Sequence, residues 1–263
     1  MMSSLVLSTP FLHCKLSASS HHSQLQYTCS YYRLPISRSS ISHRSLKNGH
    51  SSIRVVTPAN EGAIPVMNFE DFLEKDYSFL ETDRTSATEV NKKMERIISA
   101  GEIEQSSMVL VSIGSEEFVD KLVDSSPCQQ LLVVHDSLLT LACIKEKYDK
   151  VNCWQGELIY LPEKWESFDV VFLYFLPSLA HELDQVLQSL ASRCLPGARL
   201  VISHPGGREE LERQRQHYPE VIVADLPDKM SLENAAASNL FEVIEFVDEP
   251  GFYLAVIKFK AKC

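Results

Sequence analysis

The residues best suited to chemistry lie in the stretch VLVSIGSEEF, at residues 109–118. Its apolar part ends at a single glycine, Gly114. Ser115 and then Glu116 and Glu117 follow at once and open a predicted helix. This strand–turn–helix pattern is the one with which doubly wound folds bind nucleotides. The loop usually carries several glycines, which let the backbone approach the ligand, whereas two glutamates stand here. The pattern therefore indicates a nucleotide-binding type of fold with an altered ligand loop.

The elements that would position this loop alternate along the chain. Two leading helices are predicted at residues 67–80 and 87–100, the second ending at Gly101. Strands are then predicted at residues 108–113, 130–135, 151–155, 168–175 and 199–203, and helices at 115–123, 137–148, 178–193, 208–217 and 231–239, with a turn at 195–197. The fourth strand, FDVVFLYF, is apolar without alternation, as expected for a strand buried on both faces. Repeated units of this kind imply a parallel sheet with helices on both faces.

The end of the chain follows a different pattern. Two closing strands are predicted at residues 241–247 and 251–260, and only three residues separate them, so they must form an antiparallel hairpin. We therefore expect an α/β fold, a Rossmann-like, doubly wound and mostly parallel sheet closed by an antiparallel β-hairpin, with the fourth strand central. The residues expected to be almost fully buried are Val170, Val171, Leu173, Val201, Ala255 and Ile257.

From about residue 108 to residue 259 the chain resembles the class I S-adenosylmethionine-dependent methyltransferases, particularly their quinone and small-molecule branch. Five stretches carry the resemblance, in the family's order: VLVSIGSEEF, LLVVHDS, WQGELIYLPEKWESFDVVFLYFLPSL, CLPGARLVISH and LPDKMSLENAAASNLFEVIEFVDEPGFYLAVIKF. They match the first motif, the second strand, the region up to the fourth strand, the fifth strand, and the closing helix and hairpin. The resemblance implies S-adenosyl-L-methionine as cofactor and methyl transfer as activity.

The resemblance assigns cofactor binding to Gly114, Asp136, Gly156 and Glu157. Asp136 follows the second predicted strand, where a carboxylate can accept two hydrogen bonds from ribose hydroxyls. The same residue could instead cap the helix that follows. Gly156 and Glu157 would lie beside the adenine, although a solvated loop acid is the alternative for Glu157. Gly114 suits a tight turn that needs a residue free in φ.

Glu116 and Glu117 are the main departure from the family pattern. They add bulk and repel the cofactor's carboxylate, at a cost of about 1 kcal/mol, or about fivefold to tenfold in affinity. Acids in the first turn also stabilise a helix, so the pair has a structural explanation. Two functions therefore stay open. One is a plastid methyltransferase acting on a small molecule such as a quinol or phenolic; the other is a non-catalytic methyltransferase-like scaffold or interaction protein that has lost the cofactor.

Methyl transfer by in-line displacement needs alignment more than a dedicated side chain. A hydroxyl acceptor would still gain from a general base near the carboxyl ends of the fourth and fifth predicted strands. Tyr174 and His204 are the titratable residues there and are the catalytic candidates. The structural alternatives are a core aromatic for Tyr174 and a packing or capping histidine for His204.

The first sixty residues have a composition of their own. They contain no Asp or Glu, are rich in Ser, and carry scattered Arg and Lys, which is typical of an organelle transit peptide. The Ser content favours a plastid, and a basic tail kept in the mature protein is the alternative. We expect a disordered plastid transit peptide at residues 1–55, a linker and helices at 56–104, and a methyltransferase-like domain at 105–263, in the chloroplast stroma.

The charge and the cysteine content of the chain limit the kinds of partner and ligand that are expected. Without the first sixty residues the chain has 19 basic and 35 acidic residues, a net charge of −16. Phosphate backbones repel such a surface, and no apolar run is long enough to span a bilayer, so neither a nucleic acid nor stable membrane insertion is expected. The cysteines form no C-x-x-C pair and have no histidine at ligand spacing, so no metal site is predicted. The expected partner is a small-molecule methyl acceptor.

Overall fold

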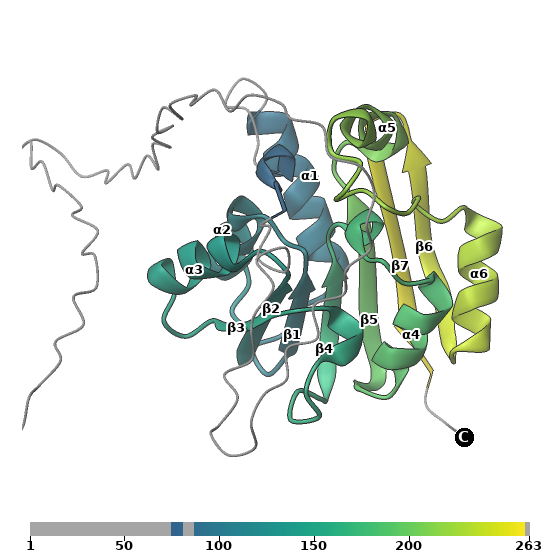
Figure 1. Cartoon of the computed structure of the whole chain (residues 1–263). Helices are drawn as coiled ribbons and strands as arrows, with labels where there is room; N and C mark the ends of the chain where they lie inside the picture. The colour runs from purple at the N-terminus through teal and green to yellow at the C-terminus, as the bar shows by residue number, and fades with distance from the viewer. Residues whose placement is uncertain (1–74, 81–86, 261–263) are drawn as a thin grey trace, which may run out of the picture. The chain divides into compact units, whose positions relative to one another are not determined.

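The computed structural model describes residues 75–80 and 87–260, which all belong to one compact unit, Ile64–Cys263 (Figure 1). The predicted transit peptide at residues 1–55 lies outside the described residues, as does most of the predicted helix at 67–80. Within the described part, no helix is both long and apolar enough to cross a membrane.

One seven-stranded sheet forms the centre of the molecule. Its strands are β1 (Met108–Ser112), β2 (Gln130–His135), β3 (Asn152–Gln155), β4 (Phe168–Leu173), β5 (Cys194–His204), β6 (Phe241–Glu249) and β7 (Phe252–Phe259). The spatial order is β3-β2-β1-β4-β5-β7-β6. The first five strands are parallel, and β7 runs antiparallel to both β5 and β6. The mostly parallel sheet with a closing antiparallel hairpin is therefore confirmed.

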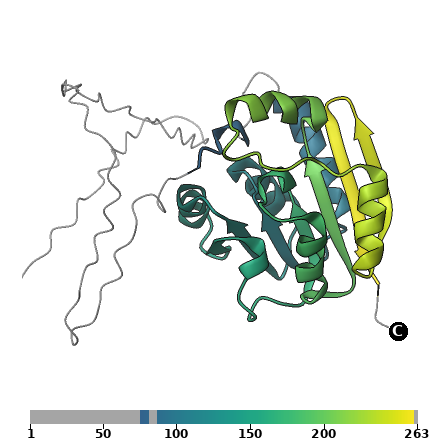
Figure 2. The same cartoon turned by 45° about the vertical axis from the view of Figure 1, so that its right-hand side comes forward.

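Helices cover both faces of this sheet, as repeated β-α units require. They are α1 (Ala87–Ala100), α2 (Glu116–Ser125), α3 (Leu138–Lys147), α4 (Leu183–Ala191), α5 (Gly207–His217) and α6 (Lys229–Ser238). Contacts link α1 to α2 and α2 to α3 on one face, and α4 to α6 on the other (Figure 2). There are also short 3₁₀ turns: η2 (Ser78–Leu80) precedes α1, whereas η3 (Leu158–Tyr160) and η4 (Leu176–Ser178) lie between longer elements.

The core is built around β4, which lies between β1 and β5. Because helices cover both faces, a central strand has no face turned to water, and β4 is apolar on both sides. All six residues expected to be buried are at most 2 % exposed: Val170, Val171, Leu173, Val201, Ala255 and Ile257. The central position of the fourth strand is confirmed.

Three predicted boundaries were wrong for local reasons. Of the helix predicted at residues 67–80, the structure describes residues 75–80, and the only helical turn there is the 3₁₀ turn η2, whose first N–H donates to the Asp76 carboxylate at 2.9 Å. The helix predicted from residue 178 begins at Leu183, because the chain first makes the turn η4 with Pro177 near its start. The turn predicted at residues 195–197 belongs to β5, whose pairing with β4 shifts register there.

The end of α1 also differs from expectation. Gly101 follows the helix as predicted, but the residue with positive φ is Glu102, at 49°. A Cβ on Gly101 would lie 2.7 Å from the Phe172 ring. The glycine is therefore needed for close packing against β4 and not for its conformational freedom.

Leu173→Ala should lower the free energy of unfolding by about 2–5 kcal/mol, because it leaves a cavity in the core beside β4, the central strand of the sheet. Urea unfolding followed by circular dichroism would measure the change. The matched control is Leu139→Ala on α3, where the leucine is 51 % exposed and a change within about 0.5 kcal/mol is expected. Equal effects of the two substitutions would contradict the buried, central placement of β4.

Candidate functional site

A cavity of 380 Å³ lies at the carboxyl edge of the sheet, among the loops that follow β1, β2 and β3. Its size is within the range of small-ligand sites, which is about 300–1,000 Å³. Asp136, Gly156 and Glu157 line it, so three of the four predicted cofactor-binding residues come together from two loops. Gly114 does not line it, and Ile113 of the same loop does. We call this space the small cavity.

The turn after β1 takes an unexpected form. Ile113 has φ 53°, a conformation rarely adopted by a β-branched residue and found most often at functional or strained sites. Gly114 does not have positive φ, so the expected reason for this glycine was wrong. It is required because a Cβ would lie 2.5 Å from Val111 Cγ1. The Ser115 side chain caps α2, and half-buried Glu116 and Glu117 form its first turn without lining the small cavity.

Asp136 lies at the end of β2 and forms an ion pair with Lys75, at 2.7 Å between Oδ2 and Nζ. Burial would raise the pKa of its carboxyl. Polar contacts with His135, Lys75 and Tyr77, together with the Lys75 charge, outweigh burial and hold the pKa well below its usual value. The helix-capping interpretation is wrong, because the side chain that caps α3 is that of Ser137, which accepts from the N–H of Thr140. Asp136 is therefore an ionised carboxylate facing a cavity.

The loop after β3 forms the opposite wall. Gly156 has φ 139°, which favours glycine, and its N–H donates to the carbonyl of His135 at 3.1 Å. The Glu157 carboxylate lies 2.6 Å from Nε2 of His181, which lines the same cavity. Glu157 is exposed, and its carboxylate pairs beside the cavity with a side chain from the loop before α4, so a solvated loop acid stays the alternative to an adenine contact.

Ser112, the last residue of β1, is a wall residue that sequence reasoning missed. It is 1 % exposed, and its Oγ has no hydrogen-bond partner among the described residues. A buried hydroxyl left unpaired costs about 1–3 kcal/mol, so a polar ligand in the small cavity would remove a penalty. The available signal was a single polar residue at the carboxyl end of an otherwise apolar strand.

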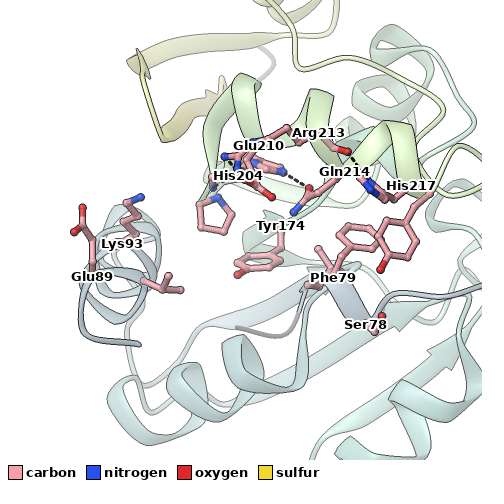
Figure 3. Close-up of a pocket in the computed structure, with 15 residues that line it drawn as sticks. Ser78, Phe79, Glu89, Lys93, Tyr174, His204, Glu210, Arg213, Gln214 and His217 are labelled. Atoms are coloured by element: carbon pink, nitrogen blue, oxygen red, sulfur yellow. Dashed lines mark hydrogen bonds and ion pairs between the residues drawn. The ribbon is translucent and has the colours of Figure 1, made fainter. Parts of the chain in front are cut away.

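A second cavity, of 720 Å³, lies at the carboxyl ends of β4 and β5 (Figure 3). We call it the large cavity. Both catalytic candidates line it: Tyr174, just after β4, and His204, the last residue of β5. Both side chains are almost fully buried, and the Tyr174 ring packs against that of Phe118 with 4.2 Å between centroids. The strand ends thus bring Tyr174 and His204 to one site.

His204 is held from both sides of its ring. Nδ1 accepts from the N–H of Gly206 at 3.2 Å, and Nε2 lies 3.2 Å from Oε1 of Gln214, to which it can donate in the neutral ring (Figure 3). Burial lowers its pKa to about 4, although the bond to Gln214 acts in the opposite direction. The ring is therefore neutral near pH 7, and it fixes the loop that begins α5.

Residues 75–80 separate the two cavities, and we call them the strap. Lys75 lines the small cavity, while Ser78, Phe79 and Leu80 line the large one. The Tyr77 ring lies edge-on to that of His135, with 4.5 Å between centroids. Sequence reasoning missed these contacts because it treated the segment as helical and its partners are distant in the chain. The part of the chain that the structure describes contains no cluster of three potential metal ligands.

No protein-family model matches the chain, and no curated protein matches its sequence. Solved structures do match. One of them is a chain in the complex between the Haloferax volcanii Trm112 methyltransferase activator and a proposed methyltransferase; it is 14 % identical, with a TM-score of 0.56 over 67 % of this chain and 92 % of that one. An S-adenosylmethionine-dependent methyltransferase from Mesorhizobium loti is 13 % identical, with a TM-score of 0.52 over 64 % and 99 %.

The mitomycin 7-O-methyltransferase is a further match, at 10 % identity and a TM-score of 0.51 over 66 % of this chain and 54 % of that one. At such identities the likeness concerns the fold alone. Together with the strand order and the antiparallel β6–β7 hairpin, it identifies the architecture. This chain has the class I methyltransferase fold.

Proposed function

We propose that this protein is an S-adenosylmethionine-dependent methyltransferase acting on a small molecule. The observation that carries the proposal is the convergence of Asp136, Gly156 and Glu157 on one cavity at the carboxyl edge of the sheet. In open α/β sheets this edge is where ligands bind, at the point where the strand order reverses. Here the reversal lies between β1 and β4.

The residues of the small cavity fit the nucleoside part of the cofactor. The ionised Asp136 carboxylate suits two ribose hydroxyls, and the unpaired Ser112 hydroxyl offers a further hydrogen bond. Glu157, at the mouth, could accept from the adenine amino group. When bound, S-adenosylmethionine supplies an electrophilic methyl group, and the task of these residues is to orient it.

The large cavity is the proposed acceptor site. Three aromatic side chains line it, from Phe79, Tyr174 and Tyr218. Its charged side chains balance: Glu89 and Lys93 are of opposite sign, and Arg213 forms an ion pair with Glu210 at 2.5 Å. An aromatic lining without net charge favours a neutral aromatic acceptor such as a quinol or phenolic.

Two features favour the second candidate, a non-catalytic methyltransferase-like scaffold. Lys75 already pairs with Asp136, while Glu116 and Glu117 occupy the place of the ligand-loop glycines. Cofactor binding distinguishes the two functions. Location in the chloroplast stroma is likewise a proposal, and it is based on the composition of the first sixty residues.

Asp136→Ala should weaken S-adenosylmethionine binding by about tenfold to a hundredfold, because a charge-assisted hydrogen bond is worth about 1.5–3 kcal/mol. Isothermal calorimetry of the full chain would measure the dissociation constant. Asp149→Ala, which removes an exposed acid away from the small cavity, is the matched control and should leave the constant unchanged. Equal affinity of wild type and Asp136→Ala would mean that Asp136 does not hold the ribose.

The double substitution Glu116→Gly with Glu117→Thr should tighten S-adenosylmethionine binding by about fivefold to tenfold, since it removes two carboxylates near the loop. The same calorimetry applies, with urea unfolding as a check, because loss of first-turn acids weakens α2. Binding by the repaired loop, with none by the wild type at millimolar ligand, would identify a scaffold that lost its cofactor through this loop. If neither protein binds, the cofactor proposal fails.

The free energy of unfolding should depend on pH because His204 is buried in its neutral form. Its folded pKa of about 4 is below the ordinary value of about 6.5, so the unfolded chain binds more protons between these values. The contribution to the free energy of unfolding is therefore complete above about pH 6.5, and it falls by up to about 1.4 kcal/mol per pH unit toward pH 4. His204→Gln should flatten this slope in urea titrations, whereas His217→Gln, at an exposed residue of the same cavity, should not. Parallel slopes for all three proteins would show that His204 is not buried in its neutral form.

A further inference from the structure

The strap crosses the sheet edge at the place where a ligand is expected. At one end, Lys75 and Tyr77 contact Asp136 and His135, at the end of β2. At the other end, Phe79 packs against Phe175, just after β4, with 5.3 Å between ring centroids. Since β1 lies between β2 and β4, the six residues pass over the end of β1. That is the reversal point of the strand order, so a segment of the protein itself lies across the expected ligand crevice.

Lys75 forms an ion pair with the Asp136 carboxylate, the group that would bind a ribose. Its Nζ lies 2.7 Å from Oδ2 of Asp136, and both residues line the small cavity. A ribose hydroxyl that donates to Asp136 must share or displace this ammonium group. The Lys75 side chain is 41 % exposed and that of Asp136 is 26 % exposed, so the ion pair is partly open to water and a ligand can replace the ammonium group.

The rest of the strap is held by aromatic contacts and a small local fold. Besides Phe175, the Phe79 ring meets that of Tyr218, with 4.6 Å between centroids. The backbone closes into one 3₁₀ turn, in which the N–H of Leu80 donates to the carbonyl of Tyr77 at 2.9 Å. One turn and one partly exposed ion pair have little intrinsic stability. The strap is therefore held in place mainly by the packing of its aromatic rings.

We propose that the strap is an internal, displaceable occupant of the cofactor crevice, held by Lys75 on Asp136 and by Phe79 beside Phe175. S-adenosylmethionine and the strap compete for the same carboxylate and for the same space over β1. The cofactor-free protein is therefore closed, and its apparent affinity is that of the open form multiplied by the fraction of molecules that are open. This inference rests on the proposed cofactor site, and it adds regulation of that site by the chain itself.

Calorimetry of the full chain with S-adenosylmethionine tests the competition. Lys75→Met keeps the apolar part of the side chain and removes the charge, so affinity should rise by about fivefold. Phe79→Ala should also raise affinity, although Phe79 does not line the small cavity, because it loosens the other end of the strap. Lys92→Met, at an exposed lysine of α1, is the matched control and should bind like the wild type.

Hydrogen–deuterium exchange of the peptide that contains residues 75–80 gives an independent readout. Displacement predicts faster exchange of the Leu80 amide when S-adenosylmethionine is bound, because its bond to Tyr77 opens. Weaker binding by Lys75→Met, or slower exchange with ligand, would show that the strap is part of the ligand-bound site and would overturn the proposal. Binding by the wild type with unchanged affinity in both variants would overturn it while leaving the proposed function intact. No binding by any of the proteins would overturn both.

Discussion

The parallel pairing of β1 with both β2 and β4 is the constraint on which the site depends. Ser112 lies opposite Val134 on one side and Leu173 on the other, so three strands end at nearly the same level. Their loops therefore leave the sheet together and must share one edge. The burial of β4 on both faces holds this register, because a shift by one residue would exchange the residues that face the two helical layers.

Polar groups at this edge can be satisfied only locally or by a ligand. Asp136 pairs with Lys75, and Glu157 pairs with His181. His204 contacts Gln214 and accepts from a backbone amide. Ser112 finds no partner among the described residues. Three of these four groups are thus paired without a ligand, although Oδ1 of Asp136 has no hydrogen-bond partner among the described residues. A ligand of the small cavity would compete with the Lys75–Asp136 ion pair and could also pair with the Ser112 hydroxyl.

The fold could be predicted from the sequence because its signals are local. The apolar run of β4, the helix start at Ser115 and the three-residue spacing before the last strand each act over a few residues. The site could be predicted only in part. Asp136 and Gly156 stand at strand ends that the pattern marks, and both line the small cavity. The partner of Asp136 could not be found in this way, because Lys75 lies sixty-one residues earlier, in a segment whose pattern is typical of a helix.

Gly114 shows a second limit of such reasoning. A glycine after a strand suggests a turn with positive φ, yet here the neighbouring Ile113 adopts that conformation and the glycine makes room for Val111. A glycine at this place in the sequence fits either explanation, positive φ or close packing, and only the packing of β1 shows which one applies. The same packing brings Ile113, and not Gly114, to the wall of the small cavity.

The hairpin that closes the sheet also affects whether copies of this protein associate edge to edge. Its outer strand, β6, is an edge strand of nine residues, with backbone groups open to pairing with another chain. Four acidic side chains stand along it, and three of them form ion pairs: Glu242 with Lys260, Glu245 with Arg96, and Asp248 with Arg208. A second strand aligned there would have to strip water from these charges. The long open edge is thereby protected against aggregation by the charged groups along it.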